Sequence, residues 1–136
     1  MSVIFIPDTL TSCNEYISAE RTNKYLAAKI KKIETERVRW ACFGVPPVED
    51  YPVHIAFMWL CPNKRLDPDN IAFARKFILD GLQKAGVLKD DSWNYINGFS
   101  DTFNLAGNRV GVNIVITSRR GSDGREQQDR VDGQYI

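Results

Sequence analysis

The stretch PVHIAFMWL, residues 52–60, decides the fold class because it has the pattern of a strand inside a sheet. Val53, Ile55, Phe57 and Trp59 alternate with positions that are themselves mostly apolar. Apolar side chains on both faces are typical of a strand that is buried on both sides. We therefore expect this strand in the interior of the domain.

Helical patterns stand on either side of this strand. The stretch IAFARKFILDGLQKAG (71–86) has apolar residues at helical spacing and closes on a glycine, which predicts one helix. Upstream, Ser12 and Glu15 have the spacing of a capping box, and a loosely apolar, basic stretch runs from there to Gly44. About thirty residues is long for one helix, so a break near Thr22 and Asn23 remains open.

Strand patterns begin and end the chain. VIFIP (3–7) predicts a short strand, and residues 93–103 and 108–118 predict two more, joined by a short turn as a hairpin. The order β-α-β-α-β-β indicates a single α+β domain over residues 1–118, with two main helices and a mixed or mostly antiparallel sheet. The polar tail, residues 119–136, is expected to be flexible or ordered only by contacts.

Composition excludes several classes of protein. The chain has 136 residues, of which 43% are hydrophobic, enough for one globular core. Its three cysteines lack C-x-x-C spacing, which argues against a disulfide framework and fits a reducing cytoplasm. No apolar run reaches the roughly 18 residues of a membrane span, and no secretory signal pattern is present. We expect no membrane association.

Charge is unevenly distributed, although the net charge is only +1. Residues 21–39 hold seven basic residues and two acidic ones, whereas aspartates gather later, at 67, 69, 90 and 91. A basic surface beside an acidic pocket suits a metal-dependent enzyme that acts on a polyanion. A solvated helix face is the alternative for any single lysine.

The first acidic segment is RLDPDNIAF, residues 65–73. Because a residue before proline is pushed into extended conformation, Asp67 should be extended. Side chains two residues apart in extended chain point to the same side, so Asp67 and Asp69 should converge. Two convergent carboxylates attract Mg²⁺, which takes one or two carboxylates and completes its shell with water and phosphate oxygens.

A second acidic segment and a lysine extend this hypothesis. Neighbours in extended chain face opposite ways, so one of Asp90 and Asp91 should join the site; we favour Asp91 as ligand and Asp90 in the outer shell. Lys76 follows Asp69 by nearly two helical turns and could offset charge on a phosphate.

Each of these residues also has a purely structural interpretation. Asp69 or Asn70 could cap the helix, Lys76 could pair with Asp80, and the Asp90–Asp91 doublet could be turn chemistry.

Other chemistries find no support in the sequence. The acidic segment lacks the glycine and glutamate of an EF-hand loop. His54 is the only histidine and lies in an apolar strand, which excludes a catalytic triad and a histidine-based zinc site. No G-x-x-x-x-G-K is present, so no nucleotide cofactor is expected. Trp93, Tyr95 and Phe99 could stack on unpaired bases, although strand packing is the simpler role.

The acidic segments resemble a known family. DPDN followed by KFILDGLQKAGVLKDD is similar to the D-x-D-N, lysine, L-D-A-L-like helix, glycine turn and D-D of the RusA-like Holliday-junction resolvases, and SCNEYISAERTNKY is similar to the opening of phage and prophage members. The similarity spans roughly residues 52–117. It implies a homodimeric, Mg²⁺- or Mn²⁺-dependent endonuclease that nicks four-way DNA junctions symmetrically, in recombination and repair.

The resemblance also implies roles for individual residues. Asp67, Asp69 and Asp91 fall on the family's metal-binding aspartates, Asp90 on the first of its doublet, and Lys76 on its lysine. In this chain the lysine follows Asn70 by six residues rather than three, which puts its distance from the metal in doubt and makes Arg75 a candidate substitute. The residues expected to contact DNA phosphates are Arg21, Lys24, Lys31, Lys32 and Arg75. The competing hypothesis is a non-catalytic nucleic-acid-binding accessory protein whose aspartates are caps and turns.

Overall fold

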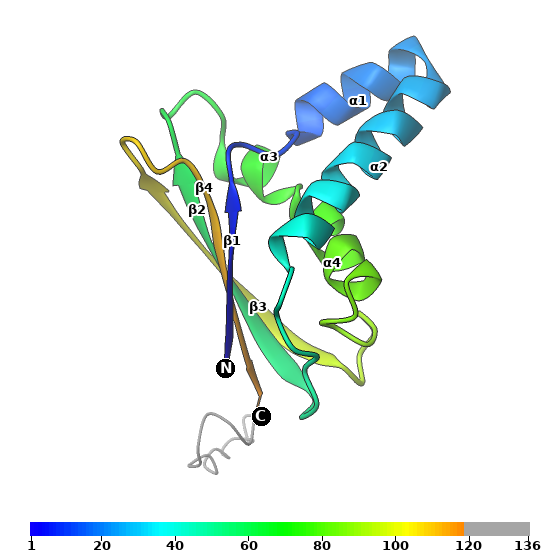
Figure 1. The fold of residues 1–136 in the computed structure, drawn as a ribbon. Coiled ribbons are helices and arrows are strands. Elements are labelled where there is room, and N and C mark those ends of the chain that lie inside the picture. Colours follow the sequence, from blue (N-terminus) through cyan, green and yellow to red (C-terminus); the bar gives the residue numbers. More distant parts are fainter. Residues whose placement is uncertain (119–136) are drawn as a thin grey trace.

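A computed structural model describes residues 1–118, and the predicted tail at 119–136 lies outside the described residues. These residues form a four-stranded sheet with all helices on one side of it (Figure 1). The α+β class and the mixed sheet agree with the sequence prediction. The elements are β1 (Ser2–Pro7), α1 (Cys13–Thr22), α2 (Lys24–Ala41), β2 (Val53–Cys61), α3 (Pro68–Ala72), α4 (Arg75–Lys84), β3 (Ile96–Leu105) and β4 (Gly111–Ser118).

The sheet has the strand order β1-β4-β2-β3. β4 pairs antiparallel with both β1 and β2, whereas β3 pairs parallel with β2. The parallel pair is connected through α3 and α4, because a chain that returns along helices must begin its next strand at the starting end of the sheet. β3 therefore forms one edge of the sheet and β1 the other.

The predicted hairpin of the last two strands is wrong. β2 lies between β3 and β4, and residues 106–110 carry the chain across the end of β2, where the Ala106 N–H donates to the Cys61 carbonyl at 2.9 Å. A turn of this length can span two strand spacings, about 10 Å. The two strands are close in sequence, which favoured a hairpin. In the sheet, however, β3 and β4 lie on opposite sides of β2.

The prediction that β2 is buried on both faces is also wrong. Val53, Ile55, Phe57 and Trp59 point into the core beneath the helices and are at most 4% exposed. On the other face Met58 is 37% exposed, because no helix of the described chain covers that side. His54 lies on this open face, where its Nε2 is 2.7 Å from the Ser100 hydroxyl.

The N-terminal helices follow the local signals in the sequence. The Ser12 side chain accepts a hydrogen bond from the Glu15 N–H, and the Glu15 carboxylate accepts one from the Ser12 N–H, which confirms the capping box. The open question of a break is settled at Asn23, which is extended, ends α1 and caps α2 through its side chain. The two helices form an arm that projects beyond the sheet (Figure 1).

The predicted second helix is divided in two. α3 ends at Ala72 and α4 begins at Arg75, with tighter hydrogen bonds between them, from the Ala74 N–H to Ile71 and from the Lys76 N–H to Phe73. The ring of Phe73 packs against Tyr16 of α1 and Phe77 of α4, which fixes this bend. α4 ends just before Gly86, which has φ +77, so the helix stop predicted from this glycine is confirmed.

None of the helices formed by residues 1–118 combines the length and the apolar character that crossing a membrane requires.

Candidate active site

The first acidic pair lies just after the carboxyl end of β2. Asp67 is extended (φ −72, ψ 154), as its position before proline predicted, and occupies the N-cap position of α3. Asp69 is different, because it lies within the first turn of α3 rather than in extended chain. The argument that alternation in extended chain aims both carboxylates at one point is therefore wrong, although both remain in one short segment.

Neither carboxylate has a structural partner. Asp67 makes no side-chain capping bond, and no side chain within residues 1–118 pairs with the carboxylate of Asp67 or of Asp69; both residues are exposed. Asn70 does cap a helix, but a different one: its Oδ1 accepts a hydrogen bond from the Asn14 N–H of α1 at 2.9 Å. The capping interpretation thus fits Asn70 and leaves the two aspartates without a structural role.

The acidic doublet divides into a structural and a free carboxylate. Asp90 accepts hydrogen bonds from the Asp91 N–H at 2.9 Å and from the Ser92 hydroxyl at 3.0 Å, which is the turn chemistry considered as the alternative. The carboxylate of Asp91 is exposed and has no partner among the described residues. Of the two, Asp91 is thus the one with oxygens available to an outside ligand.

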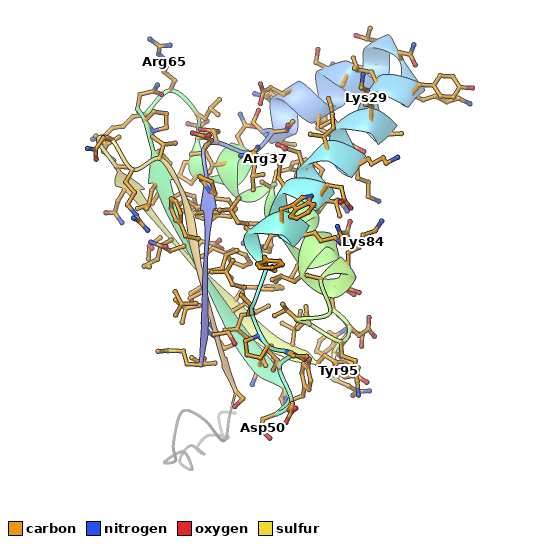
Figure 2. All side chains as sticks on the ribbon, in the orientation of Figure 1. Lys29, Arg37, Asp50, Arg65, Lys84 and Tyr95 are labelled. Atoms are coloured by element: carbon orange, nitrogen blue, oxygen red, sulfur yellow. The ribbon has the colours of Figure 1, made fainter. Side chains whose placement is uncertain are left out.

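The two acidic segments do not meet within one chain, which corrects the expectation that Asp67 and Asp69 share a pocket with Asp90 and Asp91. The first pair follows the end of β2 and the second precedes the start of β3, and these strands are parallel. Figure 2 shows Arg65, near the first pair, and Tyr95, near the second, at opposite ends of the sheet. Strands of this length span about 30 Å. In the described part of the chain no three acidic, histidine or cysteine side chains are grouped to hold a metal ion.

Lys76 is free, whereas Arg75 is not. The predicted alternative for Lys76, an ion pair with Asp80, does not form, because Asp80 lies 3.9 Å from Lys31 instead. Lys76 is exposed and has no ion pair among the described residues. The break between α3 and α4 removes the argument that it shares a helix face with Asp69.

Arg75 belongs to a half-buried cluster that the sequence analysis missed. Its guanidinium forms an ion pair with Asp101 of β3 and lies over the rings of Phe57 and Phe99, at 5.4 and 4.8 Å from their centroids. The other oxygen of Asp101 accepts a hydrogen bond from the Trp59 indole at 2.8 Å. Because its charge is already neutralised, Arg75 is a poor candidate for binding DNA phosphates or replacing Lys76. The sequence feature that could have indicated this cluster is Asp101, a lone aspartate on the inner face of a strand.

Basic side chains are exposed on the arm formed by α1 and α2. Arg21, Lys24 and Lys32 have no ion pair within the described chain, and Lys24 lies 5.5 Å from the centre of the Tyr25 ring. Lys31 is partly engaged by Asp80. Lys29, which the sequence analysis did not assign to phosphate binding, is also exposed and unpaired in this part of the chain. The arm is therefore a positively charged projection.

The three aromatic residues near the doublet have different environments. Tyr95 packs edge-on against Tyr51, with ring centroids 5.0 Å apart, and Phe99 stacks on Arg75. Trp93 is 96% exposed, so the expectation that it packs in a strand is wrong. An exposed tryptophan two residues after Asp91 provides a flat apolar surface of the kind that stacks on bases.

An apolar cavity of about 260 Å³ borders the acidic loop. Its walls come from the β1–α1 connection, the loop after β2, α3 and the start of β4, and include Leu10, Trp59, Leu66 and Ile71. Cys61 also lines it, and burial raises the pKa of this thiol. Cys61 is therefore protonated at neutral pH and is neither a ready nucleophile nor a thiolate ligand.

No protein-family model matches the chain, and no curated protein matches its sequence.

Proposed function

We propose that this protein is a metal-dependent endonuclease of the RusA-like type that cuts branched DNA as a homodimer. The observation that carries the proposal is the pair of exposed carboxylates of Asp67 and Asp69, which form neither a capping bond nor an ion pair within residues 1–118. Two exposed carboxylates of one short segment, unpaired within residues 1–118, are available to bind one cation. The number fits Mg²⁺ or Mn²⁺, which take one or two carboxylates and fill their shell with water and phosphate oxygens.

The chemistry is phosphodiester hydrolysis. A divalent cation at these carboxylates would supply a water of lowered pKa and would stabilise charge on the phosphate. Lys76, exposed and unpaired in the described chain, would place a positive charge against a phosphate oxygen. Asp91 lies at the other end of the sheet from Asp67 and Asp69 of its own chain, so it is proposed as a third ligand that the second copy in the homodimer supplies. Asp90 would orient it through the hydrogen bond from the Asp91 N–H.

The deciding experiment uses a labelled four-way junction and a linear duplex of matched sequence, each incubated with and without Mg²⁺. We expect paired, symmetric nicks on the junction in the presence of Mg²⁺ and none on the duplex. Replacement of Mg²⁺ by Ca²⁺ should leave binding but no product. Equal cutting of both substrates, or no product with either Mg²⁺ or Mn²⁺, contradicts the proposal.

The arm formed by α1 and α2 is proposed to bind DNA phosphates. Replacing Arg21 and Lys24 together by alanine should weaken junction binding about tenfold at moderate salt and lower the salt dependence by about two counterions. The matched control is Arg39→Ala, because Arg39 lies on α2, as Lys24 does, but is already paired with Glu36 at 3.2 Å. Fluorescence anisotropy across a salt series measures both quantities, and equal effects of the two variants would refute a specific role for the arm.

A non-catalytic nucleic-acid-binding protein is the second candidate. It is favoured by the exposed Trp93 and by the separation of the acidic segments within one chain. It predicts salt-sensitive binding of branched DNA and quenching of Trp93 fluorescence, with no metal-dependent product. The junction experiment separates the two candidates directly.

A further inference from the structure

The apolar cavity beside the acidic loop is formed partly by the segment that carries Asp67 and Asp69. Leu66 and Ile71 line the cavity, and both aspartates lie between these two residues in the sequence. The end of β2 and the start of β4 form further walls. A ligand in this cavity would therefore lie next to the two exposed carboxylates.

The size and the walls of the cavity indicate what kind of group it can hold. Its volume of about 260 Å³ is below the range of roughly 300–1,000 Å³ that drug-sized ligands occupy, so it suits a group of one or two rings. Leu10, Trp59 and Val112 are buried residues of its wall. The Trp59 indole N–H already donates to Asp101, so Trp59 offers the cavity an apolar ring surface. Such walls favour a flat ring with apolar faces.

Polar side chains with free groups stand at the mouth of the cavity. Asp8 lines it, is exposed and has no side-chain partner within residues 1–118. Asn63 accepts a hydrogen bond from the Arg65 N–H at 2.9 Å, which leaves its NH₂ group available as a donor. Figure 2 shows Arg65 at the outer end of the loop after β2, and its guanidinium has no ion pair in the described chain. The mouth thus offers an acceptor, a donor and a positive charge.

We propose that this cavity receives one unpaired base of the DNA substrate, an inference that rests on the proposed function. The faces of the base contact the apolar walls, and its polar edge meets Asp8 and Asn63. Arg65 contacts a phosphate of the same strand. A base and its own phosphate are separated by one sugar, so a base held here places a neighbouring phosphodiester at Asp67 and Asp69. A branch point supplies such a base at low cost, because its bases are less constrained by stacking than those of a duplex.

The base site is tested by binding, without cleavage, in Ca²⁺. The probe is a labelled four-way junction in which each nucleotide beside the branch point is replaced in turn by an abasic site. Fluorescence anisotropy gives the dissociation constants. We expect the wild type to bind the junction about tenfold more weakly when the base is missing at one of these positions, because it loses the stacking of one base.

Cys61→Phe fills the cavity and should remove this difference. Cys61 follows Trp59 by two residues in β2, so its side chain lies on the same inner face and lines the cavity. The variant should bind the intact and the abasic junction within about twofold of one another. Cys61→Ala is the matched control, since it removes the thiol, leaves the cavity open and should keep the tenfold difference.

Circular dichroism checks that Cys61→Phe is folded. If it is not, the folded wild type is alkylated with N-ethylmaleimide, and alkylated Cys61→Ala, which retains the half-buried Cys13, is the control. Blocking at Cys61 should then abolish the difference in the wild type alone.

Three results overturn the proposal: no abasic position weakens binding by the wild type, blocking the cavity leaves the tenfold difference in place, or Cys61→Ala abolishes it. Free nucleoside monophosphates are a separate arm. If they raise the melting temperature of the wild type but not of Cys61→Phe, while abasic junctions bind normally, the cavity serves free nucleotides and the proposal is wrong. Base-dependent binding without any Mg²⁺- or Mn²⁺-dependent product would instead refute the proposed function and leave the base site intact.

Discussion

Asp69→Asn is expected to lower the rate of junction cleavage about a thousandfold, because it removes the charge of one of the carboxylates proposed to hold the metal. Binding of the junction in Ca²⁺ should persist, since asparagine keeps the size of the side chain. Asp69 is exposed and has no partner within residues 1–118, so the variant should also fold normally.

The control for this substitution is Asp80→Asn. Asp80 is a partly exposed aspartate on α4 whose carboxylate lies 3.9 Å from Lys31, and it has no part in the proposed site. Single-turnover cleavage of a labelled junction measures the rate, and anisotropy in Ca²⁺ measures binding. Undiminished nicking by Asp69→Asn would contradict the assignment of Asp69 to the site. Equal losses in both variants would show that the Asp69 carboxylate has no special role in cleavage.

Glu34→Ala is expected to have the largest effect on stability, about 3 kcal/mol of unfolding free energy, because it breaks a buried, hydrogen-bonded ion pair. Glu34 is 4% exposed and accepts hydrogen bonds from the Thr11 N–H at 2.6 Å, the Thr11 hydroxyl at 2.9 Å and Arg37 at 2.9 Å. Arg37 also donates to the Pro7 and Thr9 carbonyls. The pair therefore connects the β1–α1 loop to α2. Alanine at position 34 would leave Arg37 and the Thr11 N–H without their carboxylate acceptor.

Glu36→Ala is the matched control. Glu36 pairs with Arg39 at the same spacing on the same helix, but its side chain is 38% exposed, so its loss should cost less than about 1 kcal/mol. Urea unfolding followed by circular dichroism gives both free energies. Similar values for the two variants would show that burial of the Glu34 carboxylate contributes little.

Local signals in the sequence were read correctly because the atoms involved are close along the chain. The reciprocal bonds of Ser12 and Glu15, the break at Asn23 and the stop before Gly86 each depend on residues within one or two turns. The same locality explains why Asp67 is extended: the ring of Pro68 restricts it directly.

Errors arose where one position depended on a distant partner. The hairpin prediction failed because β2, more than thirty residues earlier in the chain, occupies the place between β3 and β4. The single helix over 71–86 failed because Phe73 packs on Tyr16 of α1. Arg75 was assigned to DNA because its partner, Asp101, is 26 residues away and nothing in the spacing connects them.

The sequence by itself determined the element types, the caps and the presence of two acidic segments, because backbone preference and helical or alternating periodicity act over a few residues. The tertiary structure decided the strand order, and with it the separation of Asp67 and Asp69 from Asp90 and Asp91 to opposite ends of parallel strands. Pairing between strands is a long-range choice set by the crossover through α3 and α4, and no local pattern encodes it. That choice also placed β3 at an edge of the sheet formed by residues 1–118.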